Sequence, residues 1–294
     1  MNDDTPDDGD GIGDTGSGGA GAAGGTDRSG DGGPELRRLG VLGGMSPAST
    51  VEYYRGLNAG VNDALGGHHS APVLVDSVDF AGIESRIAGD RWDEAGTLLA
   101  GRARALDRAG VAAVLLATNT MHRVAPAIEA ALSVPLVHLH DVTAEAVLAA
   151  DCGTVGLLGT RATMEGEFAR DRLADHGLEV LVPGPDDRTL VDDAVFEELT
   201  HEVVREETRE AFERVIDDLR DRGAEGVVLG CTELELLFDD AELWRDADGA
   251  GSVAAAERGD GRSGRGSAVP VPLFDTTALH VARGVEICLG RVDP

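Results

Sequence analysis

Two short stretches of this chain carry residues that could move a proton. "VLLATNTMH" runs from Val114 to His122, "VVLGCTELE" runs from Val227 to Glu235, and each is an apolar run that stops at small polar residues. Thr118 and Cys231 hold equivalent places, at an offset of 231 − 118 = 113 residues. A thiol near a helix start has a pKa close enough to neutrality to act as acid and as base, whereas a threonine hydroxyl is a far weaker acid. The pair predicts an asymmetric proton-transfer site, in which Cys231 is the base and Thr118 donates a hydrogen bond, positions water or relays a proton.

The two stretches belong to a longer internal repeat. "GVLGGMSPAS" from Gly40 is similar to "GLLGTRATM" from Gly156 at an offset of 116 residues, and "VPLVHLHDVTA" from Val134 is similar to "VPLFDTTA" from Val271 at an offset of 137. The last offset exceeds 113 by 24 residues, about the length of a low-complexity patch at 246–267. Three matched segments in the same order predict two duplicated lobes. Facing strand ends would then address one substrate atom from two sides, which suits inversion of a stereocentre.

Short apolar runs alternate with longer, charged segments of helical period. This pattern predicts an α/β fold of two similar lobes, each with a mostly parallel sheet flanked by helices and with the active site in the cleft between them. The expected strands are residues 38–43, 72–75, 111–117, 136–139, 154–158, 180–182, 227–230 and 271–274. The expected helices are residues 48–65, 92–109 and 193–222.

Domain boundaries follow from the repeat and from composition. We assign residues 36–141 together with 270–294 to the first lobe and residues 142–245 to the second. Residues 1–34 are expected to form a disordered acidic tail, because Gly, Asp, Ser, Thr and Ala cannot bury enough apolar surface to offset the ordering entropy. Residues 246–269 are expected to form a flexible low-complexity insertion.

Composition limits the kinds of reaction and of binding partner that we expect for this chain. The chain has 25 basic against 54 acidic side chains, a net charge of −29, which argues against nucleic acid or an anionic membrane surface as partner. Such a surface is typical of halophilic proteins. Every basic residue is arginine. A pyridoxal-phosphate enzyme needs a lysine for its Schiff base, so this chain does not act on amino acids in that way.

The cysteines are few and widely spaced. Cys152, Cys231 and Cys288 form no CxxC pair, and the first 33 residues lack the apolar region of a secretory signal, so we expect free thiols and a cytoplasmic location. In "GCTE" a glycine precedes Cys231 and two capping residues follow it, which favours an exposed thiol at a helix start. Cys152 and Cys288 lack that setting and are expected to be inert.

Together, the motifs "LGVLGGMSPASTVEYY", "ATNTMH", "LLGTRATM", "GCTE" and "PLFDTTALH" resemble the aspartate/glutamate racemase family over about Leu39 to Gly290, apart from the insertion. The "GGMSP" loop is similar to that of the aspartate racemase branch. The resemblance implies a homodimeric racemase of two similar α/β lobes that interconverts L- and D-aspartate or glutamate with no cofactor and no metal. In the family, one cysteine of each lobe transfers protons. Cys231 matches the second-lobe cysteine, and Thr118 stands at the first-lobe position.

The resemblance also implies which residues contact the amino-acid substrate. Its α-carboxylate and amine would be held at Asn119, Thr120, Thr160 and Thr163, although simple helix capping is an alternative for these four. The remaining candidates are Met45 and Ser46 in the glycine-rich loop and Thr232 and Glu233 after the second cysteine. His122 is expected at a surface position of a helix. Arg86 and His201 are candidates for holding the side-chain carboxylate.

Two other functions stay open. A single thiol suffices for a decarboxylase or isomerase that protonates a carbanion from one side. A chain that has lost one catalytic thiol could also persist as a non-catalytic amino-acid-binding module. "GGMSP" and "NTMH" favour the racemase over the decarboxylase, and the presence of Cys231 in "GCTE" argues against loss of catalysis.

Overall fold

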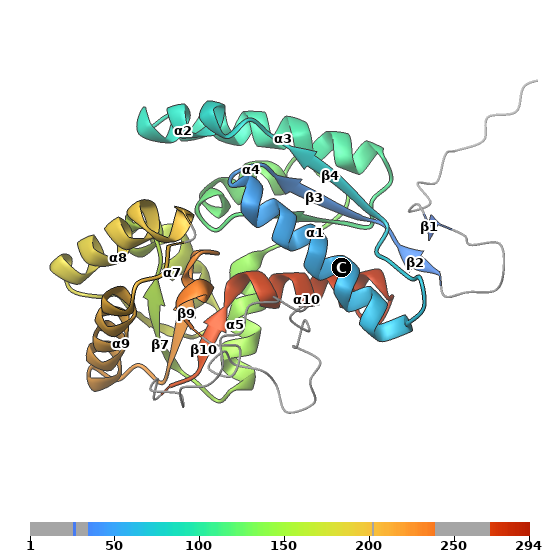
Figure 1. Cartoon of the computed structure of the whole chain (residues 1–294). Helices are drawn as coiled ribbons and strands as arrows, with labels where there is room; N and C mark the ends of the chain where they lie inside the picture. The colour runs from blue at the N-terminus through green and yellow to red at the C-terminus, as the bar shows by residue number, and fades with distance from the viewer. Residues whose placement is uncertain (1–25, 28–34, 202, 239–270) are drawn as a thin grey trace, which may run out of the picture.

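Two parallel four-stranded sheets form the frame of the molecule (Figure 1). The computed structural model describes residues 26–27, 35–201, 203–238 and 271–294, so the expected insertion and, apart from 26–27, the expected tail lie outside the described residues. The first sheet has the order β4-β3-β5-β6, with β3 (Leu39–Gly43), β4 (Val73–Ser77), β5 (Ala113–Leu116) and β6 (Leu136–Val137). The second has the order β10-β9-β7-β8, with β7 (Thr154–Leu158), β8 (Glu179–Leu181), β9 (Gly226–Leu229) and β10 (Leu273–Asp275). A short antiparallel pair, β1 (Thr26–Asp27) and β2 (Leu36–Arg37), precedes them.

The two sheets share one connectivity. In each, the second strand in the chain flanks the first on one side, and the third and fourth follow on the other side. The matched sequence segments fall on equivalent strands: Gly40 lies in β3 and Gly156 in β7, and the other two pairs lead into β5 and β9 and into β6 and β10. The prediction of two similar α/β lobes is confirmed.

Helices connect the strands and cover the sheets. The first lobe contains α1 (Pro47–Leu65), α2 (Phe80–Ala88), α3 (Trp92–Arg108), the 3-10 turn η1 (Thr120–Val124) and α4 (Ala125–Glu129), and α5 (Leu139–Ala149) leads to the second lobe. There follow α6 (Arg161–Glu165), α7 (Glu167–Asp175), α8 (Pro185–Glu197), η2 (Leu199–His201), α9 (Glu206–Asp221), η3 (Leu234–Leu237) and α10 (Thr276–Cys288). No helix in the described part of the chain is long and apolar enough to cross a membrane.

The glycine-rich loop has a defined shape because its residues fit each backbone position. Gly44 has φ +92°, and a Cβ there would lie 2.2 Å from the carbonyl oxygen of Val78, so glycine is required. Ser46 caps α1 by accepting from the Ser49 amide at 3.4 Å, and Pro47 occupies the first helical turn. The Thr50 hydroxyl accepts from the Gly44 amide at 2.8 Å and closes the loop onto the helix.

One helix expected from the sequence is divided into two in the structure. Residues 193–222 were expected to be continuous, but α8 ends at Glu197 and α9 begins at Glu206. The intervening turn is built around Glu198, whose carbonyl oxygen accepts from the amides of His201 and Val203, each at 3.0 Å. Its carboxylate accepts from the Thr208 hydroxyl at 2.6 Å, in the first turn of α9. This side chain therefore stabilises a break that helical periodicity does not reveal.

The C-terminal segment is divided between the lobes, unlike the expected assignment of residues 270–294 to the first lobe. β10 pairs in parallel with β9 of the second sheet, from Leu273 opposite Val227 to Asp275 opposite Leu229. The helix that follows, α10, packs against α1 and α5 (Figure 1). Strand β10 thus belongs to the second sheet, whereas helix α10 covers the first lobe.

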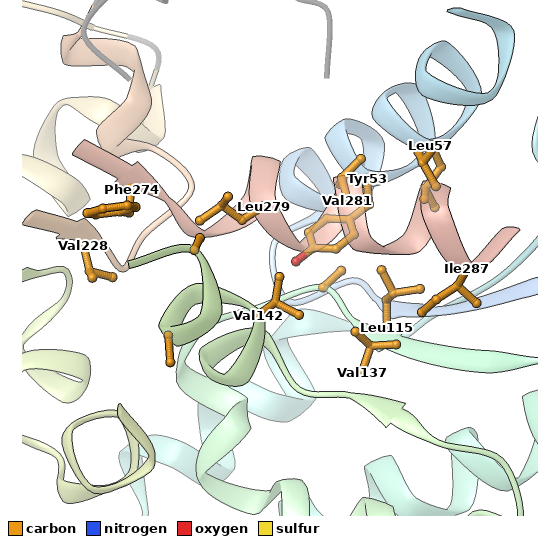
Figure 2. Packing of buried hydrophobic residues seen from close by; sticks show 14 of the residues in the cluster. Tyr53, Leu57, Leu115, Val137, Val142, Val228, Phe274, Leu279, Val281 and Ile287 are labelled. Atoms are coloured by element: carbon orange, nitrogen blue, oxygen red, sulfur yellow. The ribbon is translucent and has the colours of Figure 1, made fainter. Parts of the chain in front are cut away.

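A shared core joins the two lobes. Because strand side chains alternate between faces, Leu115 points to the shared core whereas Val114 and Leu116 point to a separate cluster under α3. In β9, Val228 points to the shared core, and its neighbours face a second-lobe cluster under α9. Figure 2 shows the shared core, in which side chains of α1, α5 and α10 pack between the sheets. Helices α5 and α10 therefore pack between the two sheets and join the two lobes.

Candidate active site

Thr118 and Cys231 lie at equivalent strand ends of the two lobes. Thr118 follows the end of β5 by two residues and Cys231 follows the end of β9 by two residues. Thr118 is 9% exposed, and Cys231 is partly exposed. In parallel sheets the carboxyl ends of strands are where ligands bind, so both residues stand where the sequence predicted a site.

Cys231 is hydrogen-bonded to the carboxylate two residues further along. Its Sγ donates to Oε2 of Glu233 at 2.8 Å, and the Thr232 hydroxyl donates to the same oxygen, also at 2.8 Å. A carboxylate only accepts, so the sulfur carries its proton in this arrangement. Glu233 does not cap η3 with its side chain and is free for this contact. The cluster pairs a thiol with a built-in proton acceptor.

The electrostatics differ from the sequence expectation, which was a thiol pKa lowered at a helix start. Burial raises the pKa of the Cys231 thiol well above its usual range, and the charge and hydrogen bond of Glu233 raise it further. Hydrogen bonds from the backbone amides of Thr232 and Glu233 act in the opposite direction but are outweighed. The turn that follows is a four-residue 3-10 helix, not a long α-helix. The resting site therefore holds a thiol rather than a thiolate.

Helix α1 of the first lobe reaches this cluster through Ser49, which lies in its first turn. The Ser49 hydroxyl lies 2.9 Å from the Thr232 hydroxyl. The single Thr232 proton points at Glu233, so Ser49 is the donor to Thr232. Ser49 is 5% exposed. A chain of hydrogen bonds thus runs from the first lobe through Thr232 to the proton acceptor of Cys231.

A second link between the lobes begins at the residue after Thr118. Asn119 Nδ2 donates to the Thr276 hydroxyl at 3.1 Å, and that hydroxyl donates to the carbonyl oxygen of Leu229 at 2.8 Å. Leu229 is the last residue of β9, two positions before Cys231. The two links bring Ser49, Asn119 and the Cys231 cluster to one interface between the lobes.

The other expected contact residues follow the ends of strands β3, β5 and β7. Thr160 and Thr163 lie at the start of α6 with their hydroxyl oxygens 3.3 Å apart, and Thr163 is fully buried. Neither Thr160 nor Asn119 makes a side-chain cap hydrogen bond, so capping does not explain those two side chains. Thr120 opens η1 and is partly exposed. Ser46 caps α1, and Met45 packs in the first-lobe core.

The sequence suggested that His122 lies at the surface, but its side chain is only 3% exposed. Its Nδ1 lies 2.8 Å from the Thr118 carbonyl oxygen, and its Nε2 lies 3.2 Å from the Leu139 amide nitrogen. The carbonyl can only accept and the amide can only donate, so the ring is neutral with its proton on Nδ1. His122 therefore fixes the backbone turn that carries Thr118.

His122 belongs to a cluster of buried imidazoles. Its ring centroid lies 4.6 Å from that of His138, 5.5 Å from that of His140 and 6.1 Å from that of His280. Burial lowers the pKa of His122, His138 and His280 to about 3 and lowers that of His140 well below its usual value. All four rings are neutral near pH 7. No sequence pattern predicted this cluster, because its members come from η1, from the junction between β6 and α5, from α5 and from α10.

The two candidates for holding a side-chain carboxylate have other surroundings. Arg86 donates to the carbonyl oxygen of Gly82 at 2.5 Å in its own helix and lies 3.9 Å from Glu94. His201 is exposed on η2. Neither hydrogen-bonds to the Cys231 cluster among the described residues. The described chain also shows no group of His, Cys, Asp or Glu side chains placed to hold a metal ion.

A pocket of about 190 Å³ is lined by His122 and by other side chains of η1, α4 and α7. Its lining includes His138, Phe168 and Arg172 but neither Thr118 nor Cys231. The chemistry of the thiol and its carboxylate therefore belongs to the interface between the lobes rather than to this pocket.

Sequence reasoning missed two residues that complete the site. Ser49 and Thr276 both lie inside motifs that it singled out, "GGMSPAST" and "PLFDTTALH". Their roles depend on contacts between lobes, to Thr232 and to Asn119, and such contacts leave no local periodicity. The clue that was available is the occurrence of small hydroxyl residues after β3 and β10, the strands beside β5 and β9.

Comparison with known proteins is consistent with this geometry. A sequence profile for the Asp/Glu/hydantoin racemases matches residues 42–284. A solved Yersinia pestis protein assigned as an Asp/Glu racemase is 39% identical, with a TM-score of 0.74 over 86% of this chain and 100% of that one. An aspartate racemase homologue from Pyrococcus horikoshii is 27% identical, with a TM-score of 0.70 over 86% and 99%. The aspartate racemase of Picrophilus torridus shares the fold at 19% identity, with a TM-score of 0.60 over 86% and 94%.

Proposed function

This chain belongs to the Asp/Glu/hydantoin racemase family, and from that premise we propose that it interconverts the L and D forms of an acidic amino acid, aspartate or glutamate, without a cofactor. The observation that carries the proposal is the hydrogen bond from Cys231 to Glu233, at the strand end equivalent to that of Thr118. Family membership supports the racemase class, and the residues at the interface support the roles given below.

The reaction begins with removal of the thiol proton. Glu233 Oε2 takes the proton from Cys231, and the resulting thiolate takes the α-proton from one face of the amino acid. The substrate becomes a carbanion, the sulfur is again a thiol, and Glu233 holds one proton. The raised thiol pKa makes this first step unfavourable, but it also makes the thiolate, once formed, a strong base toward a weakly acidic C–H bond.

Thr118 acts on the opposite face. Its hydroxyl relays a proton from water to the carbanion or hydrogen-bonds to the water that supplies it, since an alkoxide is not accessible near pH 7. The proton held by Glu233 then neutralises the hydroxide that remains, which restores the resting thiol and carboxylate. The two faces are therefore unequal, and one enantiomer should lose its α-proton faster than the other. The equilibrium ratio of the enantiomers stays the same from either side, so this preference is kinetic only.

Substrate recognition is assigned to polar groups around the thiol. Asn119 is 7% exposed, and its Oδ1 has no hydrogen-bond partner among the described residues. An ammonium group supplies the donor that this buried acceptor needs. The hydroxyls of Thr120, Thr160 and Thr163 are proposed to hold the α-carboxylate, with Met45, Ser46 and Thr232 around them.

Hydrogen–deuterium exchange tests the proposal. The purified full chain, in buffered D₂O at high salt, is incubated with L- and D-aspartate and L- and D-glutamate, and both α-proton loss and inversion are followed. We expect exchange with at least one enantiomeric pair and none after Cys231→Ala. Exchange that survives Cys231→Ala would refute the assigned base. No exchange with any of the four amino acids would refute the racemase proposal for these substrates, and binding without exchange would favour the non-catalytic module.

The quaternary state is also a proposal. We propose a homodimer, as family resemblance implies. Sedimentation equilibrium of the full chain at high salt should give twice the mass of one chain, and a mass of 30.4 kDa would contradict it.

A further inference from the structure

Thr276 is placed to decide how Asn119 presents its amide. Thr276 is fully buried at the start of α10, directly after β10, and its hydroxyl is the only atom of its side chain that can hydrogen-bond. That hydroxyl has one proton, and the Leu229 carbonyl oxygen can only accept, so the proton points at Leu229. Thr276 is therefore left as an acceptor toward Asn119.

This direction fixes the amide of Asn119. An acceptor at 3.1 Å requires the Nδ2 end of the amide to face Thr276, which turns Oδ1 away from it. A flipped amide would set two acceptors against each other. The orientation of an amide is usually ambiguous from its shape alone, but here the donor and acceptor roles of its hydrogen-bond partners determine it. The Leu229 carbonyl thus determines the Asn119 orientation through one hydroxyl.

The outcome is a buried acceptor beside Thr118. Asn119 Oδ1 is buried and has no hydrogen-bond partner among the described residues, and leaving such an acceptor unpaired is unfavourable. We propose that Thr276 is a positioning residue for amine recognition: it holds Asn119 Oδ1 as the acceptor for the α-ammonium group of the substrate. This inference rests on the proposed function and deepens it. It also explains why a strand of the second lobe is tied to the residue after Thr118.

The decisive comparison is between ligands with and without an amino group. If Thr276 lacks its hydroxyl, the Asn119 amide is free to flip and can set N–H donors against the ammonium group. Aspartate and glutamate should then bind more weakly, whereas succinate and glutarate, which have no α-amino group, should not. A merely structural role would weaken both kinds of ligand together.

The measurement is calorimetric binding to the full chain carrying Cys231→Ala, in which no turnover is expected. Adding Thr276→Val should raise the Kd of aspartate or glutamate about tenfold or more and leave that of succinate or glutarate unchanged. Adding Thr276→Ser, which keeps the hydroxyl, should restore amino-acid binding. Thr143→Val is the matched control, because it removes another fully buried hydroxyl that donates to a backbone carbonyl oxygen at 2.8 Å.

The results separate the inference from the proposed function. Equal weakening of amino and non-amino ligands, or no change with Thr276→Val, would overturn the role of Thr276 while the racemase proposal stands. The same loss in Thr143→Val would also overturn it. If neither aspartate nor glutamate binds to the Cys231→Ala parent, the proposed function itself is contradicted.

Discussion

Sγ of Cys231 and Oε2 of Glu233 are 2.8 Å apart, with the thiol as donor. One carboxylate therefore does two opposed things. Its charge makes the thiol harder to ionise, and in the proposed reaction its position makes it the group that receives the thiol proton. A variant that removes the charge but keeps the shape separates the two effects.

In Glu233→Gln, the Cys231 thiol should lose its proton more easily, and yet catalysis should be slower. Because the Glu233 carboxylate raises the pKa of the Cys231 thiol, its removal lowers that pKa, and alkylation of Cys231 by iodoacetamide should extend to lower pH. Loss of the proton acceptor should slow α-proton exchange by roughly 100-fold. Mass spectrometry of the Cys231 peptide across a pH series distinguishes this thiol from buried Cys152 and Cys288. An alkylation profile that stays in place or moves to higher pH would contradict the electrostatic role.

Thr118→Cys should raise inversion relative to exchange. A second thiol can protonate the carbanion directly, whereas the hydroxyl depends on a relay, so we expect roughly tenfold more inversion per exchange event. The backbone turn should survive the change, since His122 bonds to the carbonyl of residue 118 and not to its side chain. The ratio of inverted to retained deuterated product measures this. Thr118→Ser, which keeps a hydroxyl, is the control and should leave the ratio near that of the parent, and an unchanged ratio in Thr118→Cys would refute the explanation.

Much of the fold follows from the sequence because apolar strands and amphipathic helices leave local signals. All eight expected strands are present, and the expected helices at 48–65 and 92–109 correspond to α1 and α3. The helices α5 and α10 were not expected, and both carry buried residues on several sides. Strand β10 was assigned to the wrong lobe, although the repeat matches it to β6, which pairs with β5 as β10 pairs with β9.

For the site, too, some residues can be predicted from the sequence, whereas their roles depend on tertiary contacts. Thr118 and Cys231 are visible as the ends of matched strands, whereas the direction of the thiol pKa shift depends on burial and on where Glu233 points. The partners Ser49 and Thr276 act across the lobe boundary. A sequence shows which residues are available at a strand end, but contacts between lobes decide what each of them does.

His140→Leu should stabilise the fold and weaken its acid sensitivity. His140 is fully buried with both ring nitrogens unpartnered among the described residues, so an apolar side chain there should raise the free energy of unfolding by about 1–3 kcal/mol near pH 7. Burial, with the charges of His122, His138, His280 and Arg172, lowers the pKa of His140 well below 6.5. The unfolded chain therefore binds a proton that the folded chain refuses, and stability present above about pH 6.5 is lost as the pH falls.

Unfolding midpoints between pH 7 and pH 5, at constant high salt, measure this effect. The stability of the parent should fall with pH more steeply than that of His140→Leu, by up to about 1.4 kcal/mol per pH unit below pH 6.5. The other three buried histidines remain in both proteins, so the difference reports His140 alone. Exposed His68 provides the control, and His68→Leu should keep the slope of the parent. Parallel slopes for the parent and His140→Leu would contradict the prediction.

Ser49→Ala and Thr232→Val should have non-additive effects on exchange. The Ser49 hydroxyl donates to Thr232, and the Thr232 hydroxyl donates to the carboxylate that receives the proton of Cys231. Each single change breaks this chain and should slow exchange several-fold, on the scale of one hydrogen bond of about 1 kcal/mol. Because both act through the same contact, the double variant should be little slower than the slower single variant. Exchange rates of the four proteins at saturating substrate complete the cycle. Additive losses would show that the two hydroxyls act independently, and Ser49 would then have no part in positioning Glu233.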